Sequence, residues 1–347
     1  MPRRTFRFLI LCFFFFVVCF VELPFLKAIP ADAQSDLPGP KESLLSRKRP
    51  LVIAIVPKSL DNLLYIDAKE TAELAAERHN VQLEWVAPFK VDPDLQVKIV
   101  EGLIWRKVDG IAISCSDPEK LNKVIAKAIA ANIRVATIDA DCPGSKRLFY
   151  CGTDNYKAGR ACGEAMIKIV TQRGLANKHL RTAILTGGIE AHNLNERIRG
   201  FKEAVAGKIK LDYKALLACN DDTSTAAKLI ESYIKKHPET EVFYFSGGWA
   251  FFGPTESMPF YQKWCQNGGI AVSMDTSFPV LQAAQKGFAE ALVGQDFRRM
   301  GELTVDYLVQ AIKGLPVPNH YIDTGLELAD RSNFGLLLKQ KKPWEMK

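Results

Sequence analysis

Polar side chains of a few kinds follow the apolar segments that we predict to be strands. They are carboxylates, amides, one guanidinium, a lysine, a tyrosine and a tryptophan. Carboxylates accept hydrogen bonds from paired hydroxyls, Arg and Asn donate to hydroxyl and ring oxygens, and an aromatic face covers C–H groups. This combination suits a polyhydroxylated ligand such as a sugar. The candidate ligand-binding residues are Lys58, Asn62, Tyr65, Asp139, Asp141, Asn195, Arg197, Asp221, Trp249, Asp275 and Gln295. An acid-rich site of this kind would also suit a cationic or amino-substituted ligand.

Each of these residues also has a structural explanation. Asp and Asn are favoured at helix N-caps and in turns, where a strand passes into a helix. The prediction of a site therefore depends on the recurrence of polar types at seven strand ends. Among the aromatic residues, Trp249 follows Gly247 and Gly248, which predicts a mobile, approachable loop and stacking on a ligand, whereas Trp85 and Trp105 are expected to pack in the core.

Short β-branched runs alternate with longer segments of helical period from Leu51 onward. This alternation is typical of repeated βαβ units and a parallel sheet. One late helix shows the period clearly, with Met300, Leu303, Tyr307 and Leu308 on one face. The predicted strands are residues 51–56, 81–86, 110–114, 134–138 and 148–151, followed by 181–186, 209–217, 241–246, 269–274 and 289–294.

The predicted fold class is therefore α/β, with two consecutive doubly wound parallel-sheet lobes. The length of the chain also favours two domains of ordinary size. Ligands of open α/β sheets bind at the carboxyl ends of the strands, where loops converge and helix N-termini offer free N–H groups. The candidate residues follow the strands and so fall at this end.

The N-terminal segment predicts export. Arg3, Arg4 and Arg7 precede an apolar stretch from Phe8 to Val21, and small residues at 31 and 33 fit signal-peptidase cleavage before Gln34. An uncleaved anchor is the weaker alternative, because about 20 apolar residues are needed to span a bilayer. We expect residues 1–33 to be a signal peptide, residues 34–50 a linker, and the mature protein to be periplasmic or otherwise extracytoplasmic.

The charge and cysteine patterns speak against a nucleic-acid-binding protein and against a metal site. The formal net charge of +7 is spread through mixed-sign helices, which does not indicate nucleic-acid binding. The cysteines form no CxxC and no Cys/His cluster, so neither a metal site nor a cofactor is predicted. Cys142 and Cys151 are the first pair to test for a disulfide in an oxidising compartment, and buried free thiols remain the alternative.

Enzyme motifs are absent from the sequence. It contains no G-x-G-x-x-G after a strand, no Walker lysine motif, no G-x-S-x-G elbow and no H-E-x-x-H, and its five histidines are scattered. We therefore predict no catalytic residues and no enzymatic activity. A glycoside hydrolase that uses Asp139 or Asp141 with Asp275 stays open as an alternative, because two carboxylates can flank a glycosidic bond.

Several motifs together resemble the type I periplasmic sugar-binding proteins of the ribose-binding kind, over nearly all of residues 51–338. The first half carries the resemblance in IAIVPKSLDN at 53–62, ATIDAD at 136–141 and GTDN at 152–155. The second half carries it in NERIRGF at 195–201, Met274-Asp275 and Gly294-Gln295. Ala140 stands where ribose binders have an arginine, which speaks against ribose itself.

The resemblance implies a division of the candidate residues between two lobes. Asn62, Tyr65 and Asp139 would contact the ligand from the first lobe, and Arg197, Asp221, Asp275 and Gln295 from the second lobe and the hinge. The N-terminal lobe would comprise residues 51–153 and 296–323, and the C-terminal lobe residues 154–295 and 324–340. Three crossings between the lobes would lie near 152–155, 295–296 and 323–324.

A protein of this family would capture a sugar or related polyol between its lobes and deliver it, as a monomer, to the permease of an ABC importer. A membrane sensor kinase or chemoreceptor is the alternative partner. A ligand-sensing domain of the LacI-type repressors resembles the same fold, but no helix-turn-helix precedes Leu51 in this sequence.

Overall fold

A computed structural model describes residues 49–341. The predicted signal peptide, residues 1–33, lies outside the described residues, as does the predicted linker of residues 34–50 apart from Arg49 and Pro50. Within the described part of the chain, no helix is long and apolar enough to cross a membrane.

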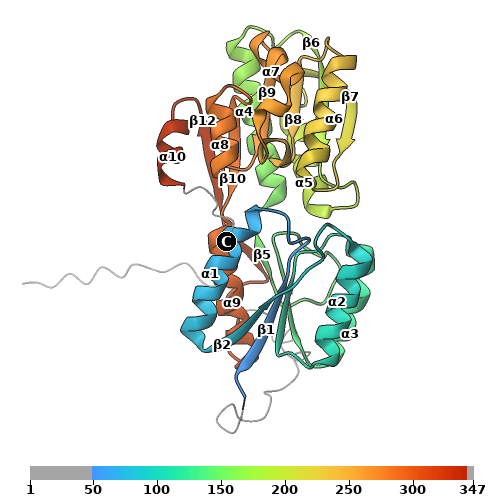
Figure 1. The fold of residues 1–347 in the computed structure, drawn as a ribbon, viewed down its shortest axis with the longest axis vertical. Helices are drawn as coiled ribbons and strands as arrows, with labels where there is room; N and C mark the ends of the chain where they lie inside the picture. Colours follow the sequence, from blue (N-terminus) through green and yellow to red (C-terminus); the bar gives the residue numbers. More distant parts are fainter. Residues whose placement is uncertain (1–48, 342–347) are drawn as a thin grey trace, which may run out of the picture. The chain divides into compact units, whose positions relative to one another are not determined.

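The first lobe is built on a six-stranded sheet of order β11-β5-β4-β3-β1-β2, in which all paired strands are parallel. Its strands are β1 (Leu51–Val56), β2 (Val81–Trp85), β3 (Gly110–Ile113), β4 (Arg134–Ile138), β5 (Tyr150–Gly152) and β11 (Tyr321–Asp323). Helices α1 (Leu64–His79) and α9 (Phe297–Ile312) cover one face, and α2 (Pro93–Trp105) and α3 (Pro118–Ala130) cover the other (Figure 1).

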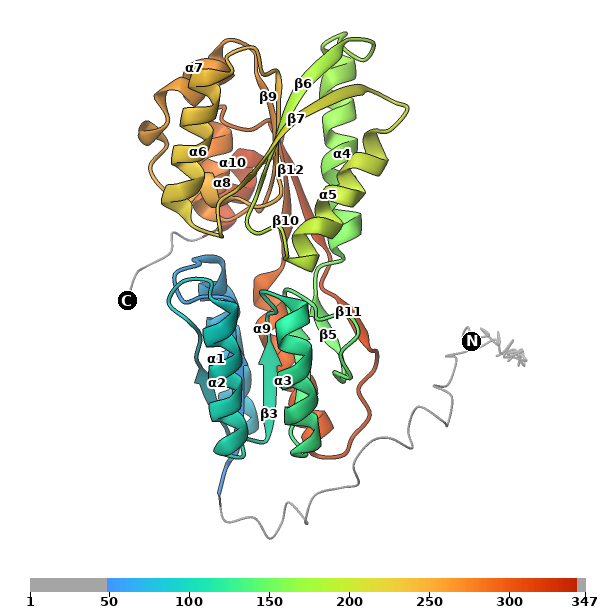
Figure 2. The ribbon, with the colours of Figure 1, turned by 90° about the vertical axis from the view of Figure 1, so that its right-hand side faces the viewer.

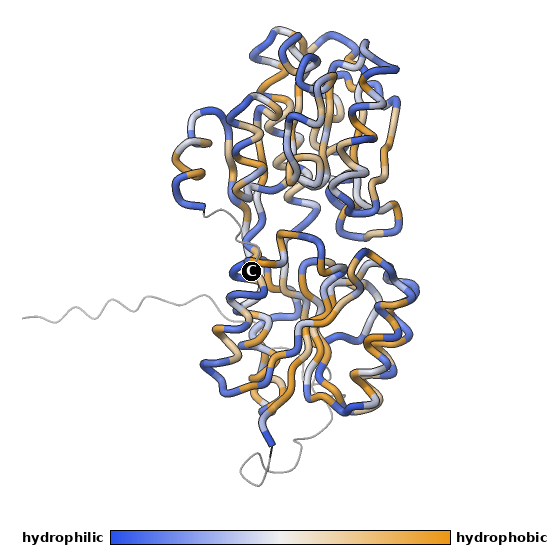
Figure 3. The backbone as a smooth tube through the Cα atoms, viewed as in Figure 1, coloured by the Kyte–Doolittle hydropathy of each residue, from blue (hydrophilic) through white to orange (hydrophobic). Residues whose placement is uncertain are grey.

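The alternation of side chains along β1 explains the two cores of this lobe. Ile53 and Ile55 point to the core under α1 and α9, whereas Ala54 and Val56 point to the core under α2 and α3. A strand that is buried on both faces must be apolar at every position, as this one is. Figure 3 shows the same pattern as hydrophobic colour along the strands.

The second lobe is built on a sheet of order β12-β10-β9-β8-β6-β7, parallel except for the antiparallel pair β10 and β12. Its strands are β6 (His179–Thr186), β7 (Lys210–Ala218), β8 (Val242–Phe245), β9 (Ile270–Met274), β10 (Ala291–Gln295) and β12 (Leu326–Asp330). Helices α4 (Asn155–Gln172) and α5 (His192–Val205) cover one face (Figure 2). The other face carries α6 (Thr223–Lys236), α7 (Pro259–Gln266), α8 (Phe278–Gln285), α10 (Phe334–Gln340) and the short 3-10 helices η3 (Trp249–Phe251) and η4 (Thr255–Ser257).

The chain passes from one sheet to the other three times. It leaves the first sheet after β5 and enters α4, it returns after β10 into α9, and it leaves again between β11 and β12. The predicted fold class, with two parallel-sheet lobes and alternating strands and helices, is confirmed. Each of the ten predicted strands is present, with ends that differ by at most two residues. The strands β11 and β12 were not among them, because β11 has only three residues and β12, which is mostly half-buried, has no run of apolar residues.

The two tryptophans that were expected to pack in the core, Trp85 and Trp105, have different environments. The prediction that Trp105 packs in the core is wrong, because its side chain is 84% exposed at the end of α2, two residues beyond the buried Leu103. Residues two apart on a helix lie about 200° apart around its axis, so the two side chains face opposite ways. Trp85 does pack as expected, edge-on against Tyr65 with ring centroids 6.4 Å apart.

The six cysteines of the described region are free thiols. Cys142 and Cys151, the pair considered for a disulfide, are both buried but have different neighbours. The Cys142 sulfur lies 3.6 Å from the Pro118 carbonyl, and the Cys151 sulfur lies 3.8 Å from the Met300 carbonyl. The structure therefore does not join this pair.

Helices α4 and α5 approach closely enough for their backbones to touch. A Cβ at Gly159 would lie 2.0 Å from the Arg197 carbonyl oxygen, and a Cβ at Gly200 would lie 2.2 Å from the Tyr156 carbonyl oxygen. No side chain larger than hydrogen fits at either position without separating the helices. This contact sets the position of Arg197 relative to α4.

Gly159→Ala should destabilise the protein by about 2 kcal/mol or more, because the added methyl group overpacks a contact between two backbones. Gly102→Ala is the matched control, because Gly102 also lies inside a helix but a Cβ there meets no atom within 4 Å. That substitution should be neutral or stabilise by ~0.5–1 kcal/mol. Chemical denaturation of the two variants compares them directly, and equal losses would show that the α4–α5 contact is not tight.

Candidate functional site

The first lobe holds a buried carboxylate at the carboxyl end of its sheet. Asp139 directly follows β4, and its Oδ2 accepts hydrogen bonds from the Tyr65 hydroxyl at 2.8 Å and the Ser114 hydroxyl at 2.7 Å. Tyr65 comes from the first turn of α1, and Ser114 follows β3. Burial and the charge of Asp139 raise the pKa of Tyr65, so the tyrosine hydroxyl keeps its proton and donates. The Asp139 side chain is therefore fixed in one orientation.

The second lobe holds a buried guanidinium that donates in three directions. Arg197 on α5 is 2% exposed. Its Nε donates to Asn155 Oδ1 at 2.8 Å, and its terminal nitrogens donate to the Ser246 carbonyl at 2.9 Å and to Gln295 Oε1 at 2.6 Å. Asn155 is the first residue of α4 and Gln295 is the last residue of β10. Each therefore lies at a point where the chain passes from one sheet to the other.

Asp275, directly after β9, extends this network. Its carboxylate accepts from Gln295 Nε2 and from the Gly248 backbone N–H, both at 2.8 Å. Burial raises the pKa of Asp275, against the opposing effect of Arg197 and of the Gln295 hydrogen bond. Asp275, Gln295 and Arg197 thus form a continuous chain of hydrogen bonds in which every side chain is held by the next.

The backbone is left-handed at each of three carboxylates that follow strands. Asp139 has φ 61°, Asp221 has φ 56° and Asp275 has φ 75°. Positive φ is uncommon outside glycine, although Asp and Asn tolerate it better than other residues. Other non-glycine residues with positive φ include Asn80, Lys107 and Asn132, which lie at or just past the C-terminal ends of α1, α2 and α3. Strained backbone concentrated at strand ends is a feature of functional sites.

Two side-chain contacts join the lobes at these strand ends. Lys58, which follows β1, donates from Nζ to Asn193 Oδ1 of α5 at 3.1 Å in a buried contact. Lys90 of the first lobe pairs with Asp222 of the second at 2.5 Å, at the surface. The carboxyl ends of the two sheets therefore face each other, and Asp139 lies within electrostatic range of both Asp221 and Asp275.

Asp221 is the least compensated group in the cluster. Its Oδ1 is buried and makes no hydrogen bond to any described group, and it lies over Gly187, where a Cβ would meet it at 1.7 Å. Burial raises the pKa of Asp221, while Lys58 opposes the rise. The absence of a side chain at Gly187 is what makes room for this carboxylate.

Other buried polar atoms at the same strand ends also lack a partner within the described region. They are the hydroxyls of Ser59, Thr186 and Ser246 and the indole nitrogen of Trp249. Buried polar groups are nearly always hydrogen-bonded, so such a concentration indicates a place where an additional molecule supplies the partners.

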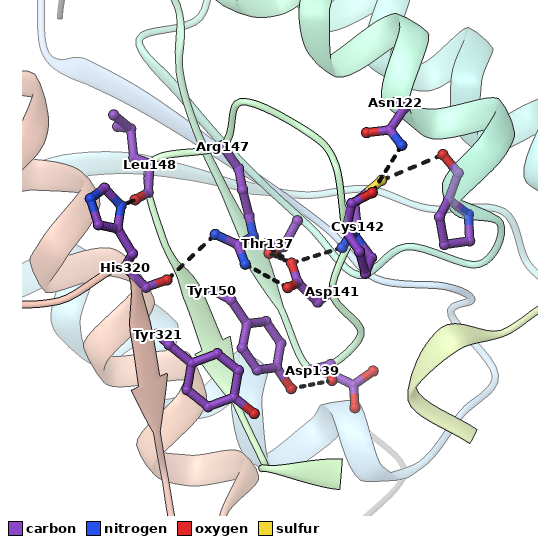
Figure 4. A network of polar contacts seen from close by, with 12 residues as sticks. Asn122, Thr137, Asp139, Asp141, Cys142, Arg147, Leu148, Tyr150, His320 and Tyr321 are labelled. Carbon is purple, nitrogen blue, oxygen red and sulfur yellow. Dashed lines mark hydrogen bonds and ion pairs between the residues drawn. The ribbon is translucent and has the colours of Figure 1, made fainter. Parts of the chain in front are cut away.

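Not every predicted site residue joins this cluster. Asp141 faces away from it, toward Arg147, which bonds both of its oxygens, and Figure 4 shows this network beside Asp139. Burial raises the pKa of Asp141, but the hydrogen bonds from Arg147 and Thr137 outweigh it and lower the pKa overall. Asn195 is exposed on α5 and donates to the carbonyl of Ile189 in the loop that precedes the helix. Asn62 accepts from the Leu64 N–H at the start of α1 and is partly buried.

The expectation that Trp249 lies in a mobile, approachable loop is wrong. It is 5% exposed, lies in η3 and packs in the second-lobe core with its ring over Gly247. Contact between Trp249 and a ligand stays a prediction. Because the ring is buried, such a contact would be made by the indole N–H and the ring edge. Phe252, just beyond η3, packs against the cores of both lobes.

Sequence reasoning missed Asn193, Ser114 and Asn155 as members of the cluster. Asn193 could have been found, because it precedes Arg197 by four residues and so shares its helix face, whereas Asn195 does not. Ser114 and Asn155 carried no comparable signal, since each acts by orienting another residue.

A groove of about 860 Å³ leads away from the cluster along α6. Its lining includes Asp61 and Asn62 of the first lobe, Asp221 and Asp222 at the end of β7, and Phe252 and Phe260. No group of three or more His, Cys, Asp or Glu in residues 49–341 is arranged to hold a metal ion, so the site carboxylates do not converge as a chelate.

The profile of the periplasmic binding protein domain family matches residues 53–316. The chain is 27% identical over 197 residues to the D-ribose/D-allose-binding protein of Pseudomonas aeruginosa, and this alignment covers 54% of the chain and 59% of that protein, less than two thirds of its length. It is 22% identical over 295 residues to the ribose import binding protein of Escherichia coli, covering 85% and 89% of the two chains.

Solved structures of sugar-binding proteins and of ABC transporter solute-binding proteins are also similar to this chain. An ABC transporter solute-binding protein of Burkholderia graminis in complex with D-arabinose superposes with a TM-score of 0.73 and 29% identity, covering 82% of this chain and 96% of that chain. A glucose-galactose binding protein of Geobacillus stearothermophilus superposes with a TM-score of 0.74 and 27% identity, covering 82% and 99%.

Proposed function

Because the chain belongs to the periplasmic binding protein family, we propose that it captures a sugar or related polyol between its two lobes and delivers it to an ABC importer. The family consists of binding proteins, so the chain is not an enzyme, and the hydrolase alternative is set aside. The named sugars of the relatives, which include ribose, allose and arabinose, support a small carbohydrate as the ligand class.

One observation carries this proposal above the others. Asp139 in the first lobe and the chain Arg197–Gln295–Asp275 in the second are held rigid by internal hydrogen bonds, while neighbouring buried polar atoms lack partners. Fixed acceptors and donors suit hydroxyl groups, each of which can donate and accept. Rigid groups of this kind bind without a large entropy cost.

The proposed mechanism is closure of the two lobes on the ligand. A ligand that contacts both lobes binds the closed form better than the open form and shifts the population toward it. We take residues 51–153 with 296–323 as one lobe, residues 154–295 with 324–340 as the other, and the three passages between them as the hinge. Arg197 bonds Asn155 and Gln295 at two of these passages, so a ligand held by this network is coupled to the hinge.

The experiment is a thermal-shift screen of the protein lacking residues 1–33 against pentoses, hexoses, polyols and amino sugars. A binding protein should show a concentration-dependent rise in Tm with at least one member, because a ligand that binds only the folded state stabilises it. The same ligand should make the protein more compact in solution scattering. A panel without any stabilising sugar would overturn the proposal.

The partner, the assembly state and the export route are part of the same proposal. We expect a monomer in the periplasm or another extracytoplasmic compartment, with no affinity for nucleic acid, and a permease or a membrane sensor as the protein partner. Size-exclusion chromatography with light scattering tests the monomer, and a pull-down from solubilised membranes with and without sugar distinguishes a permease from a sensor.

A further inference from the structure

The charges gathered at the facing strand ends do not balance. Lys58 and Arg197 bring two positive charges, and the three carboxylates Asp139, Asp221 and Asp275 bring three negative charges. The three side-chain hydrogen bonds of Arg197 are directed to Asn155, Ser246 and Gln295 rather than to a carboxylate. Lys58 directs its ammonium to Asn193.

Asp221 holds the uncompensated charge. Asp139 Oδ2 accepts from Tyr65 and Ser114, and the two oxygens of Asp275 accept from Gln295 and Gly248. Asp221 Oδ1 is buried and has no hydrogen-bond partner within residues 49–341. A buried ionised carboxylate is costly unless it is paired and hydrogen-bonded. The missing partner is therefore a hydrogen-bond donor that carries positive charge.

The groove that reaches Asp221 carries charges of both signs. Asp61, Asp222 and Glu231 line it together with Lys228 and Lys235, and Lys90 pairs with Asp222. The preference for a cation therefore comes from Asp221 itself and not from the entrance.

We propose that the ligand is an amino-substituted sugar or polyol, whose hydroxyls contact Asp139, Arg197 and Asp275 and whose ammonium group lies against Asp221. An ammonium brings three donors and one positive charge, which matches the carboxylate oxygen without a partner and the single excess negative charge. This inference rests on the proposed function and names the chemical class of its ligand.

Calorimetry with matched ligands tests the inference. The pairs are D-glucosamine and D-glucose, D-galactosamine and D-galactose, D-mannosamine and D-mannose, and 1-amino-1-deoxysorbitol and sorbitol, with N-acetyl-D-glucosamine as a neutral form of the first amine. At least one amine should bind tenfold or more tightly than its neutral parent at pH 7, and acetylation should remove the gain. If a neutral sugar binds and its amine binds no better, the inference is overturned and the proposed function stands. If none of these ligands binds but another sugar of the thermal-shift panel does, the inference is overturned and the proposed function stands. If no sugar of either set binds, the proposed function itself fails.

Asp221→Asn assigns the preference to this carboxylate. The ratio of the affinities for amine and parent should fall toward one, and the ligand-free variant should have a higher Tm than the native protein because a partly buried charge has been removed. Asp212→Asn is the control, since Asp212 lies near the opposite end of β7 from Asp221 and is paired with His179 at the surface. It should leave the ratio unchanged. A ratio that survives Asp221→Asn would show that another group selects the amine.

Discussion

Arg197→Ala should lower sugar affinity by about 100-fold or more and destabilise the protein by ~3–5 kcal/mol. Truncating one member of a buried charged network leaves the others unpaired, which costs several kcal/mol in stability and in binding. Here Asn155, the Ser246 carbonyl and Gln295 would lose their donor, and the buried Asp275 would lose its nearby positive charge. Denaturation with urea and calorimetry with the best panel ligand measure the two effects.

Arg199→Ala is the matched control for this prediction. Arg199 lies two residues further along α5 and pairs with Glu196 and Glu203 at the surface, where ion pairs contribute ~0–1 kcal/mol. Arg197→Lys keeps the charge but lacks the planar set of donors, so it should fold and still bind weakly. Equal behaviour of Arg197→Ala and Arg199→Ala would show that the buried network plays no part in binding.

Asp139→Asn and Asp141→Asn should have opposite consequences although the residues are two apart. Asp139→Asn should reduce affinity by at least about tenfold, because an amide replaces one charged acceptor and a charged hydrogen bond contributes ~1.5–3 kcal/mol. It should cost little stability, since asparagine tolerates the left-handed backbone and its oxygen can still accept from Tyr65 and Ser114.

Asp141→Asn should instead lower the free energy of unfolding by ~1–3 kcal/mol and leave affinity nearly unchanged, because its carboxylate is bonded to Arg147 and Thr137 away from the cluster. Melting curves and titrations of both variants make the comparison. A large loss of affinity in Asp141→Asn, with none in Asp139→Asn, would reverse our assignment of the two carboxylates.

The positions of the site residues could be predicted wherever a local rule decides them. Asp139 follows a strand of the first sheet, and Asp221 and Asp275 follow strands of the second, so topology alone brings each of them to the carboxyl end of its own sheet. Arg197 lies on a helix that follows such a strand, and the helical period places Asn193 beside it and Asn195 away from it. Applying the helical period to α5 would have predicted Asn193 as a site residue in place of Asn195.

Long-range partners decide the rest. Asp141 is a strand-end carboxylate like Asp139, but it is bonded to Thr137 and to Arg147, which lies across a turn of the chain. Trp249 follows two glycines, as an exposed loop residue would, but its large apolar ring is buried by the core that includes Phe251, Tyr261 and Val280. Neither outcome follows from spacing, because both depend on which segments the fold brings into contact.

The most direct test of the account is a crystal structure of the protein with the panel ligand of highest affinity. We predict one ligand between the lobes, within hydrogen-bond distance of Asp139 from the first lobe and of Arg197 or Asp275 from the second. A ligand that contacts only one lobe, or that lies in the groove along α6 with no contact to these three side chains, would contradict it.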